Sequence, residues 1–271
     1  MIKLGVNSVL FGSFDFPTAA RQVALAGYDG IEVSAIKGMC EHLVLDDWRS
    51  QSDAIRRAAT DNGLALLSME VSALEESRLL PAFDAAEALG IPVVNIGPGG
   101  KSKSAEDLDH QLGLMARMAR EAEKRGVTLC VKAHVGACID DTPTTLRAMR
   151  EIKGPGFGID MDPSHIYRAG EDPAEALGQV IARVRHVHIR DCKGRGPGPG
   201  SPQDQACGRG DIDLAAYCTV MVEADYDGPI CLEVIGAGKL DLTECSIIAA
   251  ESCGYLNACL AELGIRRGGS K

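Results

Sequence analysis

Several apolar runs of this sequence end in side chains that bind metal ions or transfer protons. Asp162 comes directly after one run, His188 lies near the end of the next, and Glu233 lies near the end of a third. A carboxylate, an imidazole and a second carboxylate from neighbouring strands can hold one divalent ion and leave positions open for a substrate. The same three groups can also form a hydrogen-bonded cluster without a metal, so both arrangements stay open.

Other apolar runs end in further polar side chains, namely Glu32, Glu70, Lys132 and His134. Charged groups are costly to bury unless a cation or hydrogen bonds compensate them. We therefore expect these side chains to share one site. Glu32 and Glu70 could bind substrate hydroxyl groups there, or form ion pairs with cations of nearby loops.

The elements that must position these side chains alternate regularly along the chain. Eight short apolar runs, rich in Val and Ile, cover residues 2–6, 30–33, 64–69, 93–96, 127–131, 157–161, 184–189 and 230–234. Helical patterns cover residues 18–26, 46–62, 74–89, 104–125, 142–152, a segment opened by Pro173, 214–224 and 245–263. Such runs are typical of parallel strands that are covered on both faces.

Eight strand and helix units predict an α/β fold, a single (β/α)8 TIM barrel, with its reactive groups at the carboxyl ends of the strands. We expect one domain over residues 1–265 and a frayed tail over residues 266–271. A doubly wound open sheet is the alternative fold. Its usual nucleotide-binding signals, GxGxxG after a strand or GxxxxGK[ST], are missing.

Charge and composition exclude several classes of function. The formal net charge is −10 and the pI is about 5.1, which argues against nucleic acid or an anionic membrane as a partner. No apolar run approaches the roughly 18 residues that a membrane span needs, and the first residues lack a signal-peptide pattern. The ten cysteines contain no CxxC pair and are expected to be reduced thiols of a cytoplasmic protein.

Five motifs together resemble the sugar-phosphate isomerase/epimerase superfamily. They are GYDGIEV at 27–33, GIDMDPSH at 158–165, HVHIRD at 186–191, GRGDID at 208–213 and CLEV at 231–234. The members of that superfamily are xylose isomerase-like TIM barrels and include ketose 3-epimerases, inosose isomerases and dehydratases, and hydroxypyruvate isomerases. The resemblance runs over nearly the whole chain but does not identify the substrate.

The resemblance implies a divalent metal held by a Glu after the fifth strand, an Asp after the sixth, a His on the seventh and a Glu after the eighth. The last three ligands fall on Asp162, His188 and Glu233. The first does not carry over, because the segment that usually reads LEPH is VKAH here and places Lys132 where the Glu belongs. One expectation is therefore a bound divalent metal (Mn, Mg, Co or Zn). The other is a metal-free site in which the ammonium group of Lys132 is the cation.

The resemblance and the charges also suggest roles for individual residues. Glu233 is the expected general base, and Lys132 would polarise a substrate carbonyl group. His165 is implied to contact substrate oxygens, and His134 matches the family's histidine after the fifth strand. Lys132 could also form a Schiff base, or only pair with Glu233 in a site that has lost catalysis.

A long loop rich in Gly and Pro, residues 192–212, follows the seventh run. A loop of this length at the mouth of a barrel is typically a lid or a contact surface. It carries Lys193 and Arg195, which could bind a phosphate or carboxylate group of the substrate.

These observations predict an isomerase or epimerase that acts on a small keto-sugar, sugar phosphate or related polyol carbonyl compound by proton transfer next to the carbonyl. A lyase or dehydratase on the same scaffold, and a non-catalytic sugar-binding homologue, are the alternatives. A DNA-repair endonuclease is disfavoured by the acidic charge. By analogy with related barrels, we expect a homodimer or homotetramer.

Overall fold

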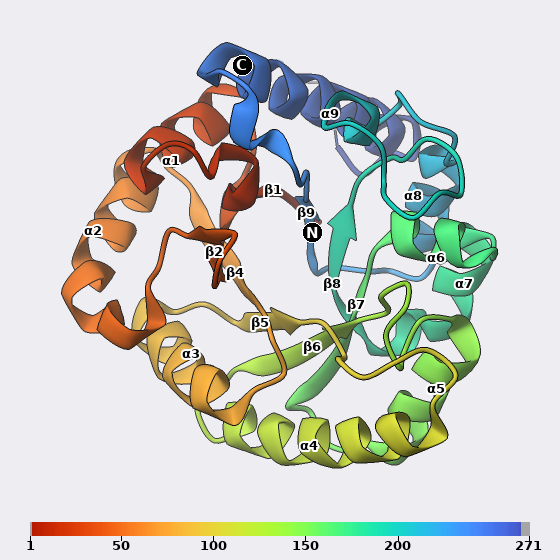
Figure 1. The fold of residues 1–271 in the computed structure, drawn as a ribbon. Helices are drawn as coiled ribbons and strands as arrows, with labels where there is room; N and C mark the ends of the chain where they lie inside the picture. Colours follow the sequence, from red (N-terminus) through yellow and green to blue (C-terminus); the bar gives the residue numbers. More distant parts are fainter. Residues whose placement is uncertain (1, 267–271) are drawn as a thin grey trace.

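Eight parallel strands close into a barrel in the computed structural model, which describes residues 2–266 (Figure 1). β1 pairs with both β2 and β9, so the barrel sheet has no open end. The barrel strands are β1 (Lys3–Asn7), β2 (Gly30–Ile36), β4 (Ala65–Ser72), β5 (Val93–Ile96), β6 (Thr128–Lys132), β7 (Phe157–Met161), β8 (Val184–Ile189) and β9 (Pro229–Leu232). The predicted (β/α)8 fold is confirmed, and the open-sheet alternative is wrong.

Helices surround the barrel on its outer face (Figure 1). They are α1 (Phe16–Leu25), α2 (Trp48–Asp61), α3 (Glu76–Leu89), α4 (Ala105–Glu123), α5 (Thr142–Glu151), α6 (Pro163–Ala169), α7 (Pro173–Val180), α8 (Leu214–Glu223) and α9 (Leu242–Glu262). Aspartates start many of them because a short carboxylate accepts the free N–H groups of a first turn. Asp172 caps α7 in this way, with Pro173 as its first residue.

Between β7 and β8 the sequence predicted one helix, whereas the structure has two. The unpredicted helix is α6, which begins directly after β7. Its first residue is Pro163, and the Asp162 side chain accepts a hydrogen bond from the Ser164 backbone N–H. Gly170, in the left-handed conformation, ends it. A second element absent from the prediction is the short strand β3 (Cys40–Glu41), antiparallel to the end of β2.

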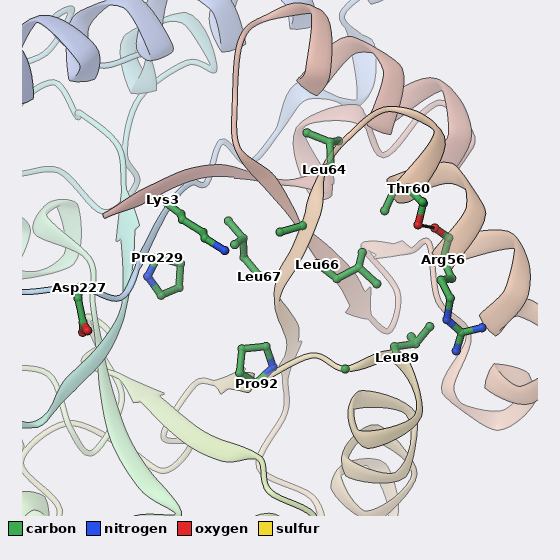
Figure 2. A pocket seen from close by; sticks show the side chains of 13 residues that line it. Lys3, Arg56, Thr60, Leu64, Leu66, Leu67, Leu89, Pro92, Asp227 and Pro229 are labelled. Carbon is green, nitrogen blue, oxygen red and sulfur yellow. Dashed lines mark hydrogen bonds between the residues drawn. The ribbon is translucent and has the colours of Figure 1, made fainter. Parts of the chain in front are cut away.

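The amino-terminal end of the barrel is filled by apolar side chains. A Cβ atom on Gly30 would lie 2.5 Å from the Ala65 carbonyl oxygen and from Leu67 Cγ, so only glycine leaves room for Leu67 there. A cavity of about 510 Å³ lies at this end and is bordered by residues such as Lys3 and Pro229 (Figure 2). The polar side chains predicted to form the site lie at the opposite ends of the strands.

The remaining features of the fold concern thiols, membrane spans and the end of the chain. The ten cysteines are free, and all except Cys259 are buried, which fits small apolar core residues. Within residues 2–266, every helix is too short or too polar to cross a bilayer. Arg266, the first residue of the predicted tail, pairs with Asp29 at 2.8 Å. The rest of that tail, residues 267–271, lies outside the described residues.

Candidate functional site

A cavity of about 490 Å³ opens at the carboxyl ends of the barrel strands. Five of the predicted site residues line it, namely Glu70, Lys132, His134, His165 and Glu233. They come from β4, the end of β6, the loop after it, α6 and the position directly after β9. The placement agrees with the general rule that the active sites of TIM barrels form at this face.

Lys132 lies at the centre of the site, and the residue is only 3% exposed. Its Nζ lies 3.0 Å from both carboxylate oxygens of Glu233 and 3.2 Å from Oε1 of Glu70. Burial alone would lower the pKa of the ammonium group, but Glu233 and Glu70 outweigh burial and raise the pKa above its usual value. Lys132 is therefore a fixed positive charge at neutral pH.

The two glutamates beside Lys132 have opposite pKa shifts. Burial, reinforced by the charge of Glu233, raises the pKa of Glu70 to about 8. Burial also opposes ionisation of Glu233, but Lys132 and Arg190 hold its pKa well below the usual range. Glu233 is therefore ionised at neutral pH, while Glu70 keeps its proton. A pair of carboxyl groups separated in this way can act as base and acid.

Arg190 lines the cavity, although the sequence patterns did not single it out. It follows β8, and its guanidinium is buried. Its Nη2 donates to Oδ2 of Asp162 at 2.7 Å and to Nε2 of His165 at 2.9 Å, and its Nε donates to Ser164 at 2.8 Å. The signal was present in the motif HVHIRD, because residues 188 and 190 project to the same side of an extended chain.

The two histidines at the rim of the cavity lie against each other. The rings of His134 and His165 have centroids 4.0 Å apart. Burial lowers the pKa of both, and the charges of Arg190 and Lys132 add to this effect at His165, whose pKa lies well below its usual value. Both rings are therefore neutral at pH 7. The ring nitrogens of His165 face Arg190 and the Val135 N–H, and Nδ1 of His134 contacts the Val135 carbonyl oxygen. Nε2 of His134 is thus the nitrogen of this pair that can bond a molecule in the cavity.

A second layer of polar residues lies beneath the cavity, inside the barrel. His188 faces one carboxylate through each ring nitrogen: Nδ1 is 2.6 Å from Asp160 and Nε2 is 2.5 Å from Glu32. Burial alone would lower the pKa of His188, but these carboxylates raise it well above its usual value. His188 is a buried imidazolium, and its ring nitrogens have no free lone pair.

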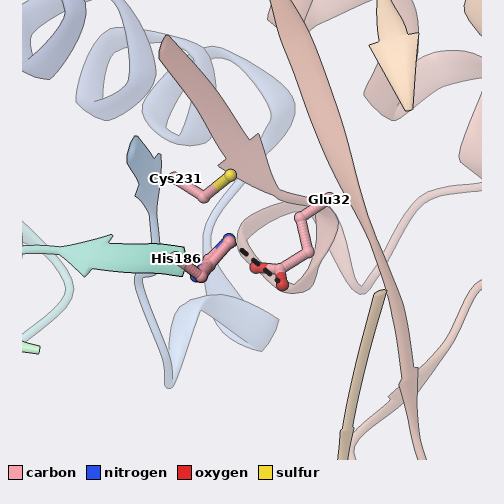
Figure 3. A group of neighbouring side chains, drawn as sticks. All are labelled: Glu32, His186 and Cys231. Carbon is pink, nitrogen blue, oxygen red and sulfur yellow. Dashed lines mark ion pairs between the residues drawn. The ribbon is translucent and has the colours of Figure 1, made fainter. Parts of the chain in front are cut away.

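Other side chains complete this inner layer. Asn95 donates to Glu32 at 2.7 Å, and His186 contacts Asp160 at 2.9 Å and Ser68 at 2.9 Å. Figure 3 shows His186 and Cys231 pointing toward Glu32 in the barrel interior. Glu32 does not line the cavity and is 0% exposed, so the structure gives it a partner in His188 in place of the predicted substrate contact.

Because Asp160 pairs with the His188 ring and also accepts the His188 backbone N–H, we expect Asp160→Asn to destabilise the protein by about 3–5 kcal/mol, the usual effect of breaking a buried ion pair by removing one partner. The free energy of unfolding from urea titration measures this. Asp53→Asn, which removes an exposed ion pair with Arg56, is the matched control and should change little. A loss near 1 kcal/mol for Asp160→Asn would contradict a strong Asp160–His188 ion pair and leave Glu32 as the main partner of His188.

Three groups of side chains in the described part of the chain could each offer three ligand atoms to a metal ion. They are Glu32, His186 and Cys231; Asp160, His186 and His188; and Glu32, Glu70 and His188. The composition of the inner layer thus includes metal-ligating side chains, but His188, a member of two groups, would have to release its proton before it could bind a metal. Neither Asp162 nor Glu233 belongs to any of these groups.

The three ligands implied by the resemblance do not fit a divalent ion as they are arranged. Asp162 accepts hydrogen bonds from Arg190 and from the Ser164 backbone N–H. Lys132 donates to both carboxylate oxygens of Glu233. Nη1 of Arg190 also lies 3.3 Å from Glu233. A dication among these groups would sit beside two positive side chains, and each contact near 4 Å would cost several kcal/mol even at moderate dielectric.

The loop over residues 192–212 borders the cavity through Pro197, Gly198 and Pro199. Its predicted anion-binding residues do not line the cavity: Lys193 is exposed elsewhere, and the Arg195 guanidinium stacks 4.0 Å above the Tyr167 ring. The arginines that do line the cavity are Arg168 and Arg190.

The loop is held in place by the side chain of Asp191, just before it. Its carboxylate accepts hydrogen bonds from the backbone N–H groups of Cys192, Gly208 and Ile212. A Cβ atom on residue 210 would lie 2.2 Å from that carboxylate, so Gly210 is required for this close approach. Asp191 therefore organises the loop and is not part of the cavity lining.

Comparisons with known proteins agree with this geometry. The inosose dehydratase of Geobacillus thermodenitrificans is 24% identical over 226 residues, which cover 71% of this chain and 72% of that protein. Among solved structures, a D-tagatose 3-epimerase-like protein superposes with a TM-score of 0.78 at 18% identity, covering 97% of this chain and 98% of that one. The IOLI protein with a bound zinc atom gives a TM-score of 0.77 at 17% identity, covering 94% and 97%.

Residues 20–253 match the family described as Xylose isomerase-like TIM barrel, which is most of the chain. The strand order, the cavity at the carboxyl ends of the strands and the family match are mutually consistent. This chain therefore belongs to the xylose isomerase-like TIM barrel family.

Proposed function

We propose that this chain is an isomerase or epimerase that transfers a proton next to the carbonyl group of a small polyhydroxylated compound. The observation that carries the proposal is the buried Lys132 ammonium group, which lies between Glu70 and Glu233 in a cavity of about 490 Å³. A cavity of this size suits a single sugar-sized molecule. The relatives named as inosose dehydratase and D-tagatose 3-epimerase-like protein support a substrate of this class.

Each group has a role that follows from its charge. Lys132 donates to the carbonyl oxygen and stabilises the negative charge that develops there when the neighbouring C–H proton leaves. Glu233 is ionised and takes that proton. Its basicity rises when the carbonyl oxygen draws the Lys132 ammonium group away, because Lys132 is the main cation that keeps its pKa low.

Glu70 returns a proton to the intermediate. It is protonated at neutral pH, and its Oε1 lies 3.2 Å from the same Lys132 nitrogen that contacts Glu233. The two carboxyl groups therefore flank the position of the carbonyl oxygen. After one turnover Glu233 carries the proton and Glu70 is ionised, and exchange with solvent restores the starting state.

Dehydration is the second candidate function, and the protonated state of Glu70 favours it. In this reaction Glu233 takes the same C–H proton, and Glu70 gives its proton to a hydroxyl group that leaves as water from the adjacent carbon. The name inosose dehydratase of the sequence relatives supports this alternative. Both reactions share the first proton transfer, so the same residues serve either outcome.

The oligomeric state, a homodimer or homotetramer, and the cytoplasmic location stay predictions.

The experiment that tests the function is proton exchange in D2O. The protein is incubated with a panel of keto-sugars and keto-inositols, and the products are followed by NMR and mass spectrometry. Deuterium next to the carbonyl with an otherwise unchanged mass indicates an isomerase or epimerase, and loss of water indicates a dehydratase. Absence of exchange with every compound, for a protein that still binds one of them, would favour the non-catalytic alternative.

We expect activity to be insensitive to chelators, because Lys132 and Arg190 occupy the positions next to the carboxylates that a dication would need. After dialysis against EDTA, kcat/KM should stay within about twofold of its starting value, a change of less than ~0.5 kcal/mol. Metal analysis of protein purified without chelator provides the second readout. Stoichiometric Mn, Mg, Co or Zn, together with activity that EDTA removes and the metal restores, would contradict the metal-free site.

A further inference from the structure

One nitrogen of the Arg190 guanidinium has no hydrogen-bond partner in the described structure. Nε and Nη2 donate to Ser164, Asp162 and His165, whereas Nη1 makes no hydrogen bond, although it lies 3.3 Å from an oxygen of Glu233. The residue is 2% exposed and lines the cavity. Buried charged donors are rarely left unpaired because this costs more than for neutral groups. Nη1 is therefore suited to a bond with an acceptor inside the cavity.

The cavity lining holds more cationic side chains than carboxyl groups, although the protein is acidic. Lys132, Arg168 and Arg190 line it, and the carboxyl groups that line it are Glu70 and Glu233. The cations of the lining thus outnumber its carboxyl groups by three to two. Asp162, which is not part of the lining, pairs with Nη2 of Arg190. The whole chain carries −10, so this local excess of positive charge is unusual for the molecule.

Arg168 lines the same cavity as Arg190 and connects it to the loop above it. Its guanidinium donates to the backbone carbonyl groups of Gly196 and Pro197, and Pro197 also borders the cavity. Burial and the charge of Arg190 lower the pKa of Arg168, so the two guanidinium groups repel each other. An anion bound between them would relieve this repulsion.

We propose that the substrate carries an oxyanion group, a carboxylate or a phosphate, which Nη1 of Arg190 and the Arg168 side chain bind. Guanidinium groups recognise both anions through strong, charge-assisted hydrogen bonds. The proposal rests on the proposed function only in taking this cavity as the substrate site. It assigns anion recognition to two arginines of the barrel mouth, and not to the loop cations Lys193 and Arg195.

Binding measurements on paired compounds test the proposal without any need for turnover. The probes are D-fructose 6-phosphate against D-fructose, D-glucuronate against D-glucose, and inorganic phosphate alone, studied by isothermal titration calorimetry at low and high salt. We expect the charged member of at least one pair to bind about tenfold tighter or more, and high salt to reduce this advantage. The pair that shows it identifies the group as phosphate or carboxylate.

Two variants locate the effect. Arg168→Gln should reduce the charged-to-neutral affinity ratio about tenfold, and Arg168→Lys should retain part of it because the charge is kept. Arg195→Gln is the matched control, since this arginine lies outside the cavity, and should leave the ratio unchanged. Thermal unfolding of each variant shows whether the fold is intact. Arg190 itself is a poorer choice, because its removal leaves Asp162 buried without its cation.

Equal affinities for charged and neutral members would overturn the proposal, as would no binding by any charged probe. An advantage that Arg168→Gln leaves unchanged, or that Arg195→Gln removes, would also overturn it. These outcomes are distinct from failure of the proposed function. A protein that prefers anions but shows no proton exchange would keep the oxyanion site and lose the catalytic assignment. A protein that shows proton exchange but no preference for anions would keep the catalytic assignment and lose the oxyanion site.

Discussion

Replacing Lys132 by Met is expected to lower kcat/KM by about 10²–10³-fold, the usual effect of removing one group that stabilises charge in a transition state. Methionine has a similar length, so the change removes the charge and keeps most of the packing. The substitution also affects the general base Glu233, because the Lys132 charge keeps the pKa of Glu233 low. Without it, Glu233 should hold its proton to a higher pH, and the acidic limb of the pH–rate profile should move upward.

Steady-state kinetics on the substrate found by proton exchange measure this effect. Lys193→Met is the matched control, because this lysine is exposed and does not line the cavity, and it should retain full activity. Reduction with borohydride in the presence of substrate provides a separate readout. A stable covalent adduct on Lys132 would show that the lysine forms a Schiff base, and full activity of Lys132→Met would remove it from catalysis.

The fold was predictable because each strand is a short apolar run of a parallel sheet covered on both faces. The positions of Lys132 and Glu233 followed from it, since both lie where a strand ends. The prediction that Glu32 shares the substrate site was wrong about how deep Glu32 lies in the barrel. The sequence suggested a strand ending at residue 33, whereas β2 continues to Ile36. Glu32 therefore lies a layer below the cavity, where it meets His188.

The partners of the site residues could not be predicted in the same way. Asp162 and His188 occupy the expected strand ends, but a strand end does not determine which charge will face a carboxylate. Arg190 reaches Asp162 from the neighbouring strand, and Asp160 reaches His188 across β7 and β8. Such contacts depend on register and side-chain direction between neighbouring strands, here for residues 28 positions apart in sequence. A spacing of two residues between His188 and Arg190 was the available signal.

The pKa of Glu70 predicts a stability that depends on pH. It is raised from the ordinary 4.5 to about 8, so between these values the folded protein keeps a proton that the unfolded chain releases. The contribution of Glu70 to stability is therefore fully present below pH 4.5 and is lost as pH rises through about 8. Linkage sets the slope of this loss at ~1.4 kcal/mol per pH unit at most.

Comparison of the wild type with Glu70→Gln isolates this contribution, because glutamine resembles the protonated acid and cannot ionise. We expect the wild type to lose stability relative to Glu70→Gln as pH rises from about 5 to 8, in urea titrations at each pH. Glu233 has a depressed pKa and acts in the opposite direction, since its contribution is lost as pH falls below 4.5. Glu87→Gln, an exposed glutamate, is the control and should follow the wild type.

The same proton connects stability and catalysis at this site. If Glu70 is the acid, kcat should fall as pH rises through about 8, in the range where the stability difference levels off. If the stability difference between wild type and Glu70→Gln is instead independent of pH, Glu70 is already ionised at neutral pH. The proton that completes the reaction must then come from another group.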